Sequence, residues 1–335
     1  MRTLNANDYK IFKHLVSLKQ SGLFKTMETF LRRKYETVVS TKDYIYTIGD
    51  IPVTLVAHLD TVFTNPPKTI YCDQQENVLW SPEGLGADDR AGVFAIVKIV
   101  QAGLKPHIIF TTNEELGGVG AAALVKQIPH PFAEMKYIIQ LDRHGDCDCV
   151  FYDCDNKDFI KYIEQFGFIE NQGSFSDISE ICPVWKIAGV NLSIGYRDEH
   201  SISETLHVTP FLATIDRVIN MLKDVENAPT FKYIPSFSYA YGWNKTYKNA
   251  WLTDDTLRCV KCKHYFSEYE LFPVKCKDGK TRFYCPDCMT NIPWCIICGQ
   301  PYEPNPKKPS KICSDCRGGK NQCGTLNSSK VKLKV

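Results

Sequence analysis

Side chains that can bind metal ions follow three apolar runs of the chain. "VTLVAHLD" ends in His58 and Asp60, "HIIFTTNEE" ends in Glu114 and Glu115, and "YIIQLD" ends in Asp142. In an open α/β sheet, ligands bind beyond the carboxyl ends of the strands. We therefore expect these five side chains to meet at one edge of a sheet, although they are far apart in the sequence.

Two further segments add candidate ligands. "GLGADDRAG" places Asp88 and Asp89 after a glycine turn where a helix begins, and "IGYRDEHS" places His200 just past a strand. Each segment alone is a weak signal, because an acid at a helix start is usually a cap. All five segments together, in alternating α/β order, indicate a site.

The residue types in this set fit a pair of metal ions. Imidazole and carboxylate groups suit Zn²⁺, and also Mn²⁺ or Co²⁺. Two histidines and several carboxylates can hold a close metal pair with one carboxylate as the bridge, and such a pair activates water and polarises a carbonyl. Nearby cations would also offset the repulsion between Glu114 and Glu115, which is otherwise costly at the end of a buried strand.

Strands and helices alternate over most of the first 225 residues. A helical pattern covers 7–35 and is expected to divide into two helices near Gly22, and a hairpin is expected over 69–80. The other predicted strands are 37–41, 44–49, 52–58, 107–112, 137–142 and 190–195, and the other predicted helices are 88–103, 118–128, 156–167 and 209–225. This order predicts an α/β fold with a mostly parallel central sheet.

The motifs resemble those of a known superfamily. "AHLDTVF", "GLGADDRAG", "TTNEELGGVGA", "QLD" and "DEHS" follow, in order, the motifs of the co-catalytic di-zinc metallopeptidases, which include tripeptidases, aminoacylases and leucyl-type aminopeptidases. The resemblance covers roughly residues 50 to 210. It implies a three-layer zinc-exopeptidase-like domain that cleaves peptide or acyl-amide bonds near a terminus of the substrate.

The resemblance also implies a role for each motif residue. The five implied metal ligands are His58 and Asp142 on one metal, Glu115 and His200 on the other, and Asp88 as the bridge. Glu114 would be the general base, and Asp60 would hydrogen-bond the second ring nitrogen of His58. Asp89 and Glu204 would support the ligands from behind.

Several alternatives to these assignments remain open at the level of the sequence. Asp89 could replace Asp88 as the bridge, and His207 or His144 could replace His200. Asp142 could instead be a structural acid paired with Arg143. The intervals from His58 to Asp88 and from Asp142 to His200 are too short for an inserted lid or dimerisation domain, so we expect a bare catalytic domain. Arg143, Arg197 and Asp177 are the candidates for binding the free α-amino or α-carboxyl group of a substrate, and the sequence does not choose among them.

The C-terminal part of the chain predicts a second metal-binding module. It contains ten of the 15 cysteines, and eight of them form four C-x-x-C pairs, which in a cytosolic chain indicate structural zinc rather than disulfides. Sequential pairing gives two zinc sites of four cysteines each, and a crossed pairing needs longer loops to close. The expected zinc ligands are Cys259, Cys262, Cys285, Cys288, Cys295, Cys298, Cys313 and Cys316.

Charge divides the chain in the same place. Residues 256–335 carry 15 Lys/Arg against 6 Asp/Glu, whereas residues 1–255 carry 25 against 32. Eight thiolates and two Zn²⁺ ions would together reduce the net charge of this part from +9 to about +5. The module therefore either caps the catalytic domain or binds a protein or nucleic-acid partner.

We predict four segments: a di-metal hydrolase domain over 1–225, an aromatic-rich linker over 226–255, a double zinc-ribbon module over 256–320 and a basic tail over 321–335. The start "MRTLNANDYK" lacks the apolar stretch of a signal peptide, and no apolar run is long enough to span a bilayer, so we expect a cytoplasmic protein.

The predicted function is hydrolysis of peptide or amide bonds, by an aminopeptidase or small-peptide hydrolase. An amide deacylase of the same fold is the next alternative. A binding protein on a retired enzyme scaffold and a two-metal phosphoesterase are further hypotheses.

Overall fold

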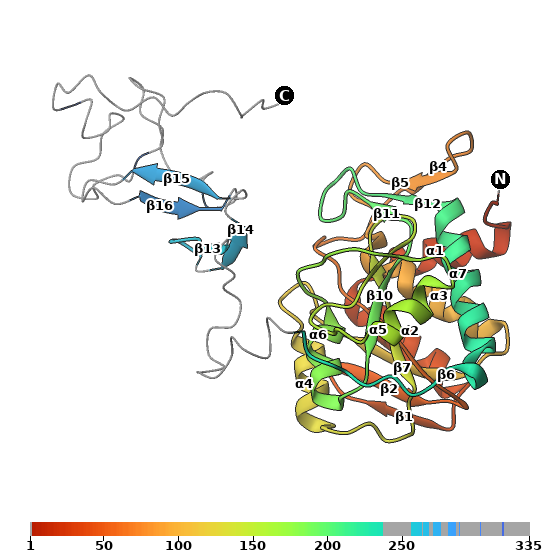
Figure 1. Ribbon diagram of the computed structural model, residues 1–335. Coiled ribbons are helices and arrows are strands. Elements are labelled where there is room, and N and C mark those ends of the chain that lie inside the picture. Colours follow the sequence, from red (N-terminus) through yellow and green to blue (C-terminus); the bar gives the residue numbers. More distant parts are fainter. Residues whose placement is uncertain are drawn as a thin grey trace. The chain divides into compact units, whose positions relative to one another are not determined.

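The computed structural model describes residues 2–236 and, beyond them, 256–262, 264–267, 271–275, 281–285, 288, 302 and 317. The chain divides into two compact units, Met1–Trp243 and Asn244–Val335 (Figure 1). Among the described residues, no helix is long and apolar enough to cross a membrane.

The first unit is built around a mixed eight-stranded sheet with the order β1-β2-β6-β3-β7-β10-β8-β9. Its four middle strands, β6, β3, β7 and β10, are parallel, as the alternating sequence predicted. The strands are β1 (Thr37–Ser40), β2 (Tyr44–Ile48), β3 (Ile51–His58), β6 (Pro106–Thr111), β7 (Tyr137–Arg143), β8 (Asp148–Val150), β9 (Ile169–Glu170) and β10 (Gly189–Ser193).

Helices cover both faces of this sheet, which gives the predicted three layers. Along β3, Val53 and Leu55 face a large core shared with α1 (Ala6–Val16), α2 (Gln20–Arg32), α3 (Ala87–Gln101), α5 (Lys157–Glu164) and α7 (Val208–Lys223). Val56 faces the opposite core, shared with α4 (Val119–Gln127) and α6 (Asp177–Trp185). Figure 1 shows α4 and α6 on one side of the sheet and α1, α3 and α7 on the other.

The division of the N-terminal helical region is not where the sequence suggested. The break between α1 and α2 falls at Ser17–Lys19, and Gly22 lies inside α2. Ser17 ends α1 because its hydroxyl bonds back to the carbonyls of Lys13 and His14, and Lys19 is extended. Gly22 therefore causes no break, since a glycine is tolerated inside a helix that tertiary packing stabilises.

A second, antiparallel sheet has the order β11-β12-β5-β4. The predicted hairpin is present as β4 (Tyr71–Asp73) and β5 (Val78–Trp80), and its Tyr71 and Trp80 rings stack at 4.8 Å. Its partners β11 (Tyr196–Arg197) and β12 (Thr205–His207) were not predicted, because strands of two or three residues give no periodic signal. These two strands flank the loop that carries His200.

Helix α6 was also missed, because Pro183 lies inside it and a proline usually breaks a helical pattern. Its start is fixed by a capping box in which Ser176 and Ser179 satisfy each other's backbone N–H groups. A short 3₁₀ helix, Val225–Asn227, follows α7. Beyond it, Phe231 of the predicted linker is buried against the rings of Phe159 and Tyr162, whereas linker residues 237–255 lie outside the described residues.

The second unit contains two short antiparallel pairs. β13 (Thr256–Arg258) pairs with β14 (Tyr265–Ser267), and β15 (Phe272–Lys275) pairs with β16 (Thr281–Tyr284). Cys259 directly follows β13, and Cys285 directly follows β16.

Candidate metal centre

Asp88 lies between two histidines at the carboxyl end of the sheet. Its Oδ1 is 3.0 Å from Nε2 of His58, and its Oδ2 is 3.1 Å from Nε2 of His200. The two oxygens of one carboxylate thus serve two different imidazoles, which is the arrangement of a bridging ligand.

Two groups of metal-binding atoms share this carboxylate. His58, Asp88 and Asp142 form one group, and Asp88, Glu115 and His200 form the other, each with its ligand atoms within 4.8 Å of one another. His58 Nε2 lies 3.4 Å from Asp142 Oδ1, and His200 Nε2 lies 3.0 Å from Glu115 Oε2. Nitrogen and oxygen ligands of a tetrahedral zinc are about 3.4 Å apart, because each lies about 2.1 Å from the metal. The spacing and chemistry of both groups therefore fit a divalent ion.

The loop that carries Asp88 is held by one buried carboxylate. Glu204 accepts hydrogen bonds from the backbone N–H groups of Gly86, Ala87 (3.1 Å) and Asp88 (3.0 Å). Asp88 and Asp89 have non-helical backbone angles, so regular helix starts only after them. Glu204 thus satisfies the amides of an irregular turn and fixes the direction in which Asp88 leaves the backbone.

Asp89 points away from the metal-binding atoms. Its Oδ2 accepts from the N–H of His58 (3.2 Å), and its Oδ1 accepts from the N–H of Gly92 (2.9 Å). Asp89 is therefore a backbone cap that joins α3 to β3, and the geometry favours Asp88 over Asp89 as the bridge.

Asp60 has a contact that the sequence did not reveal. Its two oxygens accept the backbone N–H groups of Glu114 and Glu115, both at 3.0 Å. Its expected partner, Nδ1 of His58, is 3.4 Å from Oδ1, which is long for a hydrogen bond. Asp60 therefore fixes the turn that presents the two glutamates, in addition to lying beside the ring of His58. Asp60 meets the two glutamates because β3 and β6 are paired in parallel and end side by side.

Asp142 is held by neighbours other than Arg143. Its Oδ2 accepts from Gln140 Nε2 (3.0 Å) and Ser176 Oγ (3.1 Å), and its Oδ1 accepts from the hydroxyl of Tyr196 (3.2 Å). These three donors leave Oδ1 directed toward His58. Gln140 belongs to the "QLD" motif, whereas Ser176 and Tyr196 lie outside the motifs because they come from other elements.

The two alternative histidines lie outside both groups. His144 pairs through Nδ1 with Glu199 (2.5 Å), and His207 ends β12 at the other sheet. His200 has a left-handed backbone with φ of 61°, a conformation uncommon for a non-glycine residue and frequent at functional sites. Its side chain is 54 % exposed, whereas that of His58 is 1 % exposed, so the second group faces solvent and the first is buried.

The carboxylates raise the proton affinity of both imidazoles. Burial alone would lower the pKa of His58, but Asp142, Asp60 and Asp88 raise it well above its usual value. Hydrogen bonds to Asp88 and Glu115 raise the pKa of His200 to about 11. Conversely, although burial opposes it, hydrogen bonds from both histidines lower the pKa of Asp88. The site is thus built to neutralise cationic charge.

Glu114 lies beside the two groups without belonging to either. Burial raises the pKa of its carboxyl well above the usual value, with His58 opposing and Asp142 and Asp177 adding to the rise. Asp177, at the start of α6, is fully buried and bonds Thr111 Oγ1 at 2.5 Å. A cation at the site would favour the charged form of Glu114, which a proton acceptor needs.

The second unit contains a group of four thiols. Cys259, Cys262, Cys285 and Cys288 have sulfur atoms within 4.8 Å of one another, the donor set of a structural zinc site. This grouping joins the first C-x-x-C pair to the second, as sequential pairing predicts. The other four predicted ligands, Cys295, Cys298, Cys313 and Cys316, lie outside the described residues.

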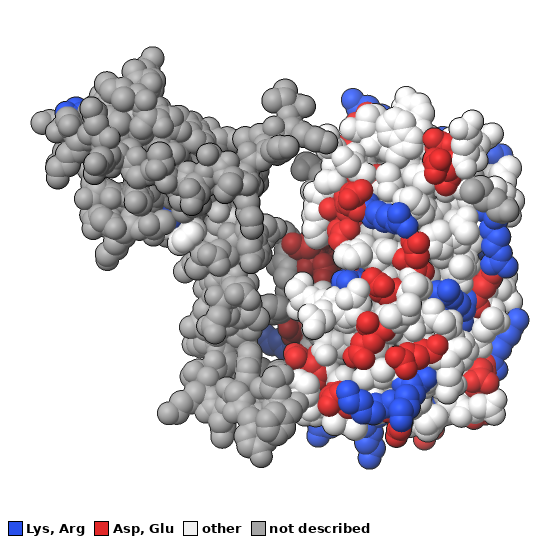
Figure 2. Space-filling view, turned by 45° about the horizontal axis from the view of Figure 1, so that its top comes forward, with Lys and Arg blue, Asp and Glu red and all other residues white. Residues whose placement is uncertain are grey.

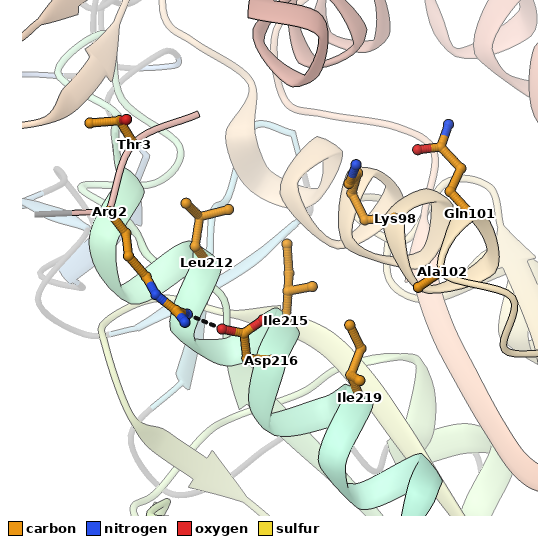
Figure 3. A pocket seen from close by; sticks show the side chains of 9 residues that line it. All are labelled: Arg2, Thr3, Lys98, Gln101, Ala102, Leu212, Ile215, Asp216 and Ile219. Carbon is orange, nitrogen blue, oxygen red and sulfur yellow. Dashed lines mark hydrogen bonds and ion pairs between the residues drawn. The ribbon is translucent and has the colours of Figure 1, made fainter. Parts of the chain in front are cut away.

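One pocket of the first unit is unrelated to these groups. It has a volume of about 540 Å³ and is lined by Lys98 and Gln101 of α3, several residues of α7, and Arg2, which forms an ion pair with Asp216 (Figure 3). A second pocket of about 310 Å³ includes Asp60 and Arg90 in its lining and thus lies next to the candidate metal centre. On the face seen in Figure 2, acidic and basic side chains are interspersed over the first unit.

Comparison with known proteins places the motifs in a family context. Residues 42–162 match the model of peptidase family M28. This segment contains His58, Asp88, Glu114, Glu115 and Asp142. A search among curated proteins finds no match to the sequence.

Solved structures resemble about two thirds of the chain. A tripeptidase from Staphylococcus aureus subsp. aureus Mu50 superimposes with a TM-score of 0.54 at 14% identity, over 68% of this chain and 100% of its own. The aminopeptidase PepT of Bacillus cereus superimposes with a TM-score of 0.53 at 14% identity, over 65% of this chain and 98% of its own. A TET aminopeptidase from a marine-sediment Thaumarchaeota archaeon superimposes with a TM-score of 0.51 at 13% identity, over 66% of this chain and 99% of its own. At such identities the likeness shows the shared fold.

Proposed function

We propose that the first unit, a metallopeptidase domain of the co-catalytic superfamily, acts as a di-metal aminopeptidase or small-peptide hydrolase. The observation that carries this proposal is the Asp88 carboxylate, whose two oxygens lie near two different imidazoles. His58 and Asp142 would hold the first metal, and Glu115 and His200 the second. Zinc is the expected ion, with Mn²⁺ or Co²⁺ as alternatives.

A bound metal pair would supply polarisation of the scissile carbonyl and acidification of the attacking water. Glu114 would take a proton from that water and pass it to the leaving amine. Asp60 contributes by fixing the backbone of Glu114 and Glu115, so that the base and one ligand keep a constant separation. His200, on the exposed side of the site, would lie nearest the entering substrate.

The test is hydrolysis of matched substrates by the full chain before and after removal of metals with a chelator. The panel contains short peptides with free amino termini, their N-acetyl derivatives, N-acylated amino acids and a phosphodiester. We expect cleavage of the free peptides, its loss with the chelator and its return with Zn²⁺. Cleavage of N-acylated amino acids in preference to free peptides would instead support the amide deacylase, which shares the donor set.

Failure to cleave any of these substrates while retaining two metals in the first unit would contradict the proposed peptidase. That outcome would favour the hypothesis of a retired scaffold that acts through its zinc module. Preferential cleavage of the phosphodiester would favour a two-metal phosphoesterase.

The second unit is proposed to bind structural zinc through two sites of four cysteines each. The four grouped thiols support one of them, and the sequence pattern alone supports the other. A protein or nucleic-acid partner for this unit, the segment boundaries and a cytoplasmic location stay predictions from the sequence.

A further inference from the structure

Arg143 follows the ligand Asp142 at the end of β7, where the strand has an irregularity. Asn191 of β10 pairs with Gln140, but Ser193 pairs with Arg143, so β7 has one more residue than β10 in this interval. An extra residue of this kind changes the alternation of side chains and is frequent next to active sites. It returns Arg143 to the sheet face of Gln140, which is the face covered by α6.

The guanidinium of Arg143 lies beside the loop that precedes α6. A Cβ atom added to Gly173 would be 3.5 Å from its Nη1 and 3.3 Å from Cε1 of Tyr152. The Tyr152 hydroxyl accepts from Asn191 Nδ2 (3.0 Å), which also donates to the carbonyl of Asp142 (2.8 Å). Arg143 therefore follows Asp142 along the chain, and its guanidinium lies beside the same loop glycine as Tyr152, which Asn191 joins to Asp142.

The charge of Arg143 is not neutralised by any acid within the described part of the chain. Its Nε is buried there without a hydrogen-bond partner, and its guanidinium forms no ion pair. The other arginines near the site differ. Arg197 is paired with both oxygens of Asp146, and Arg90 donates to the backbone carbonyls of Leu59 and Leu18.

An unpaired, half-buried guanidinium next to a carbonyl-polarising site is suited to bind an anionic group of the substrate. A guanidinium forms two parallel hydrogen bonds with a carboxylate, which makes it selective for that group. A peptide substrate carries such a group at its C-terminal end. Asp177, the acidic alternative, is fully buried and bonded to Thr111, so it is not available to a substrate.

We propose that Arg143 binds the α-carboxylate of the substrate, so that this site selects short peptides with a free C-terminus, cleaved one or two residues from that end. This inference rests on the proposed peptidase function and specifies its substrate class. Peptides too long to place their carboxylate at Arg143, and peptide amides, are disfavoured.

The experiment compares the dipeptide Leu-Gly and the tripeptide Leu-Gly-Gly with their C-terminal amides, using the full, metal-loaded chain. The quantity measured is the ratio of kcat/KM for each acid to kcat/KM for its amide. This ratio does not depend on the fraction of enzyme that is active, so a partly misfolded variant still gives a valid result. We expect the wild type to prefer at least one acid by about 10- to 100-fold, the effect of a charge-assisted hydrogen bond.

In Arg143→Ala the ratio should fall to near one, mainly through a higher KM for the acid. Arg143→Lys should keep part of the preference, because it retains the charge but loses the planar fork. Arg197→Ala is the matched control and should keep the wild-type ratio.

Two results would overturn the inference while leaving the peptidase function intact. One is equal cleavage of acids and amides by the wild type, and the other is an unchanged ratio in Arg143→Ala. Absence of cleavage for all four peptides would instead overturn the proposed function and the inference with it.

Discussion

At the scale of single residues, a few carboxylates determine the geometry of the centre by binding backbone amides. Glu204 holds the turn before Asp88, and Asp60 holds the turn of Glu114 and Glu115. Asp89 joins the backbone of His58 to the start of α3. The candidate metal ligands are therefore positioned by carboxylates that bind the neighbouring backbone amides.

The role of Glu204 gives a first prediction. Burial raises the pKa of Glu204 to about 7, and its oxygens face three backbone donors. Glu204→Gln turns an amide NH₂ toward one of those donors and releases the turn of Asp88. Metal affinity should fall by about 10- to 100-fold, as for other groups that orient ligands, and a chelator competition would measure it. Glu199→Gln is the control, and equal affinities of the two variants would contradict the role of Glu204.

The histidines predict how metal binding depends on pH. The pKa of His200 is raised to about 11, and that of His58 is raised well above its usual value, so we expect both rings to carry protons in the metal-free protein. A metal must displace those protons, so its apparent affinity should rise with pH until the pH passes these pKa values.

Calorimetry at pH 7 in buffers of different ionisation enthalpy checks this prediction. With Mn²⁺, which thiolates bind weakly, we expect a net release of protons, from the two histidines and from Glu114, whose pKa is also raised. His144→Ala should give the same number, because His144 is outside both ligand groups. Heats that do not vary with the buffer would show that the histidines are not protonated ligands.

The residues of the centre were predictable to different degrees. His58, Asp88, Glu115, Asp142 and His200 follow strand ends or a helix start, and the structure brings these five together. The contact of Asp60 with two amides and the contacts of Tyr196 and Ser176 with Asp142 could not be predicted, because they join elements that are distant in sequence. The direction of Arg143 depends on one extra residue in β7, which leaves no periodic signal.

At the scale of elements, α3 approaches β7 so closely that a side chain is excluded. A Cβ atom on Gly92 would lie 2.2 Å from the carbonyl oxygen of Leu141 and 2.4 Å from Oδ1 of Asp89. The helix carries Asp88 at one end, and β7 carries Asp142 just after Leu141. This contact therefore helps to set the distance between two of the candidate ligands.

Two glycine substitutions test this contact. Gly92→Ala should destabilise the protein by about 3 kcal/mol, because overpacking a close contact forces backbone shifts. In Gly22→Ala the new Cβ would be 3.7 Å from the nearest atom, an ordinary contact, and alanine favours helix by about 0.5–1 kcal/mol. The midpoint of urea unfolding should therefore fall in Gly92→Ala and rise in Gly22→Ala. A Gly92→Ala protein as stable as the wild type would contradict the packing.

The elements themselves divide by length and periodicity. Seven of the longer elements lie where the sequence pattern predicted them, because their apolar residues repeat with a clear period. They are α3, β6, α4, β7, α5, β10 and α7, whereas α6 was not predicted. The division of 7–35 at Gly22 was wrong, because Ser17 ended the first helix instead. The short strands of the second sheet could not be predicted, because strands of two or three residues are stabilised only by pairing with segments distant in the sequence.

At the scale of the whole molecule, the chain joins a unit that carries the proposed metal centre to a cysteine-rich unit. The two units use different donors, since the first offers imidazole and carboxylate and the second offers thiolates. The two kinds of site should therefore gain and lose metals independently.

Cysteine substitutions test this independence. Cys259→Ser should remove one zinc from the full chain and leave peptide cleavage unchanged, because its thiol belongs to the group in the second unit. Cys72→Ser is the control, since Cys72 is an exposed free thiol. Metal analysis by mass spectrometry would measure the difference. An equal zinc content in the two variants would contradict the assignment of Cys259.

The most direct test of the proposed centre separates the two adjacent glutamates. Peptide hydrolysis and metal content should be measured together for Glu114→Gln, with Glu115→Ala as its matched partner. We predict that Glu114→Gln keeps both metals of the first unit and lowers kcat by about 10²- to 10⁴-fold, the contribution of a general base. Glu115→Ala should lose metal affinity. A Glu114→Gln protein that cleaves peptides at near wild-type rates would contradict the central claim.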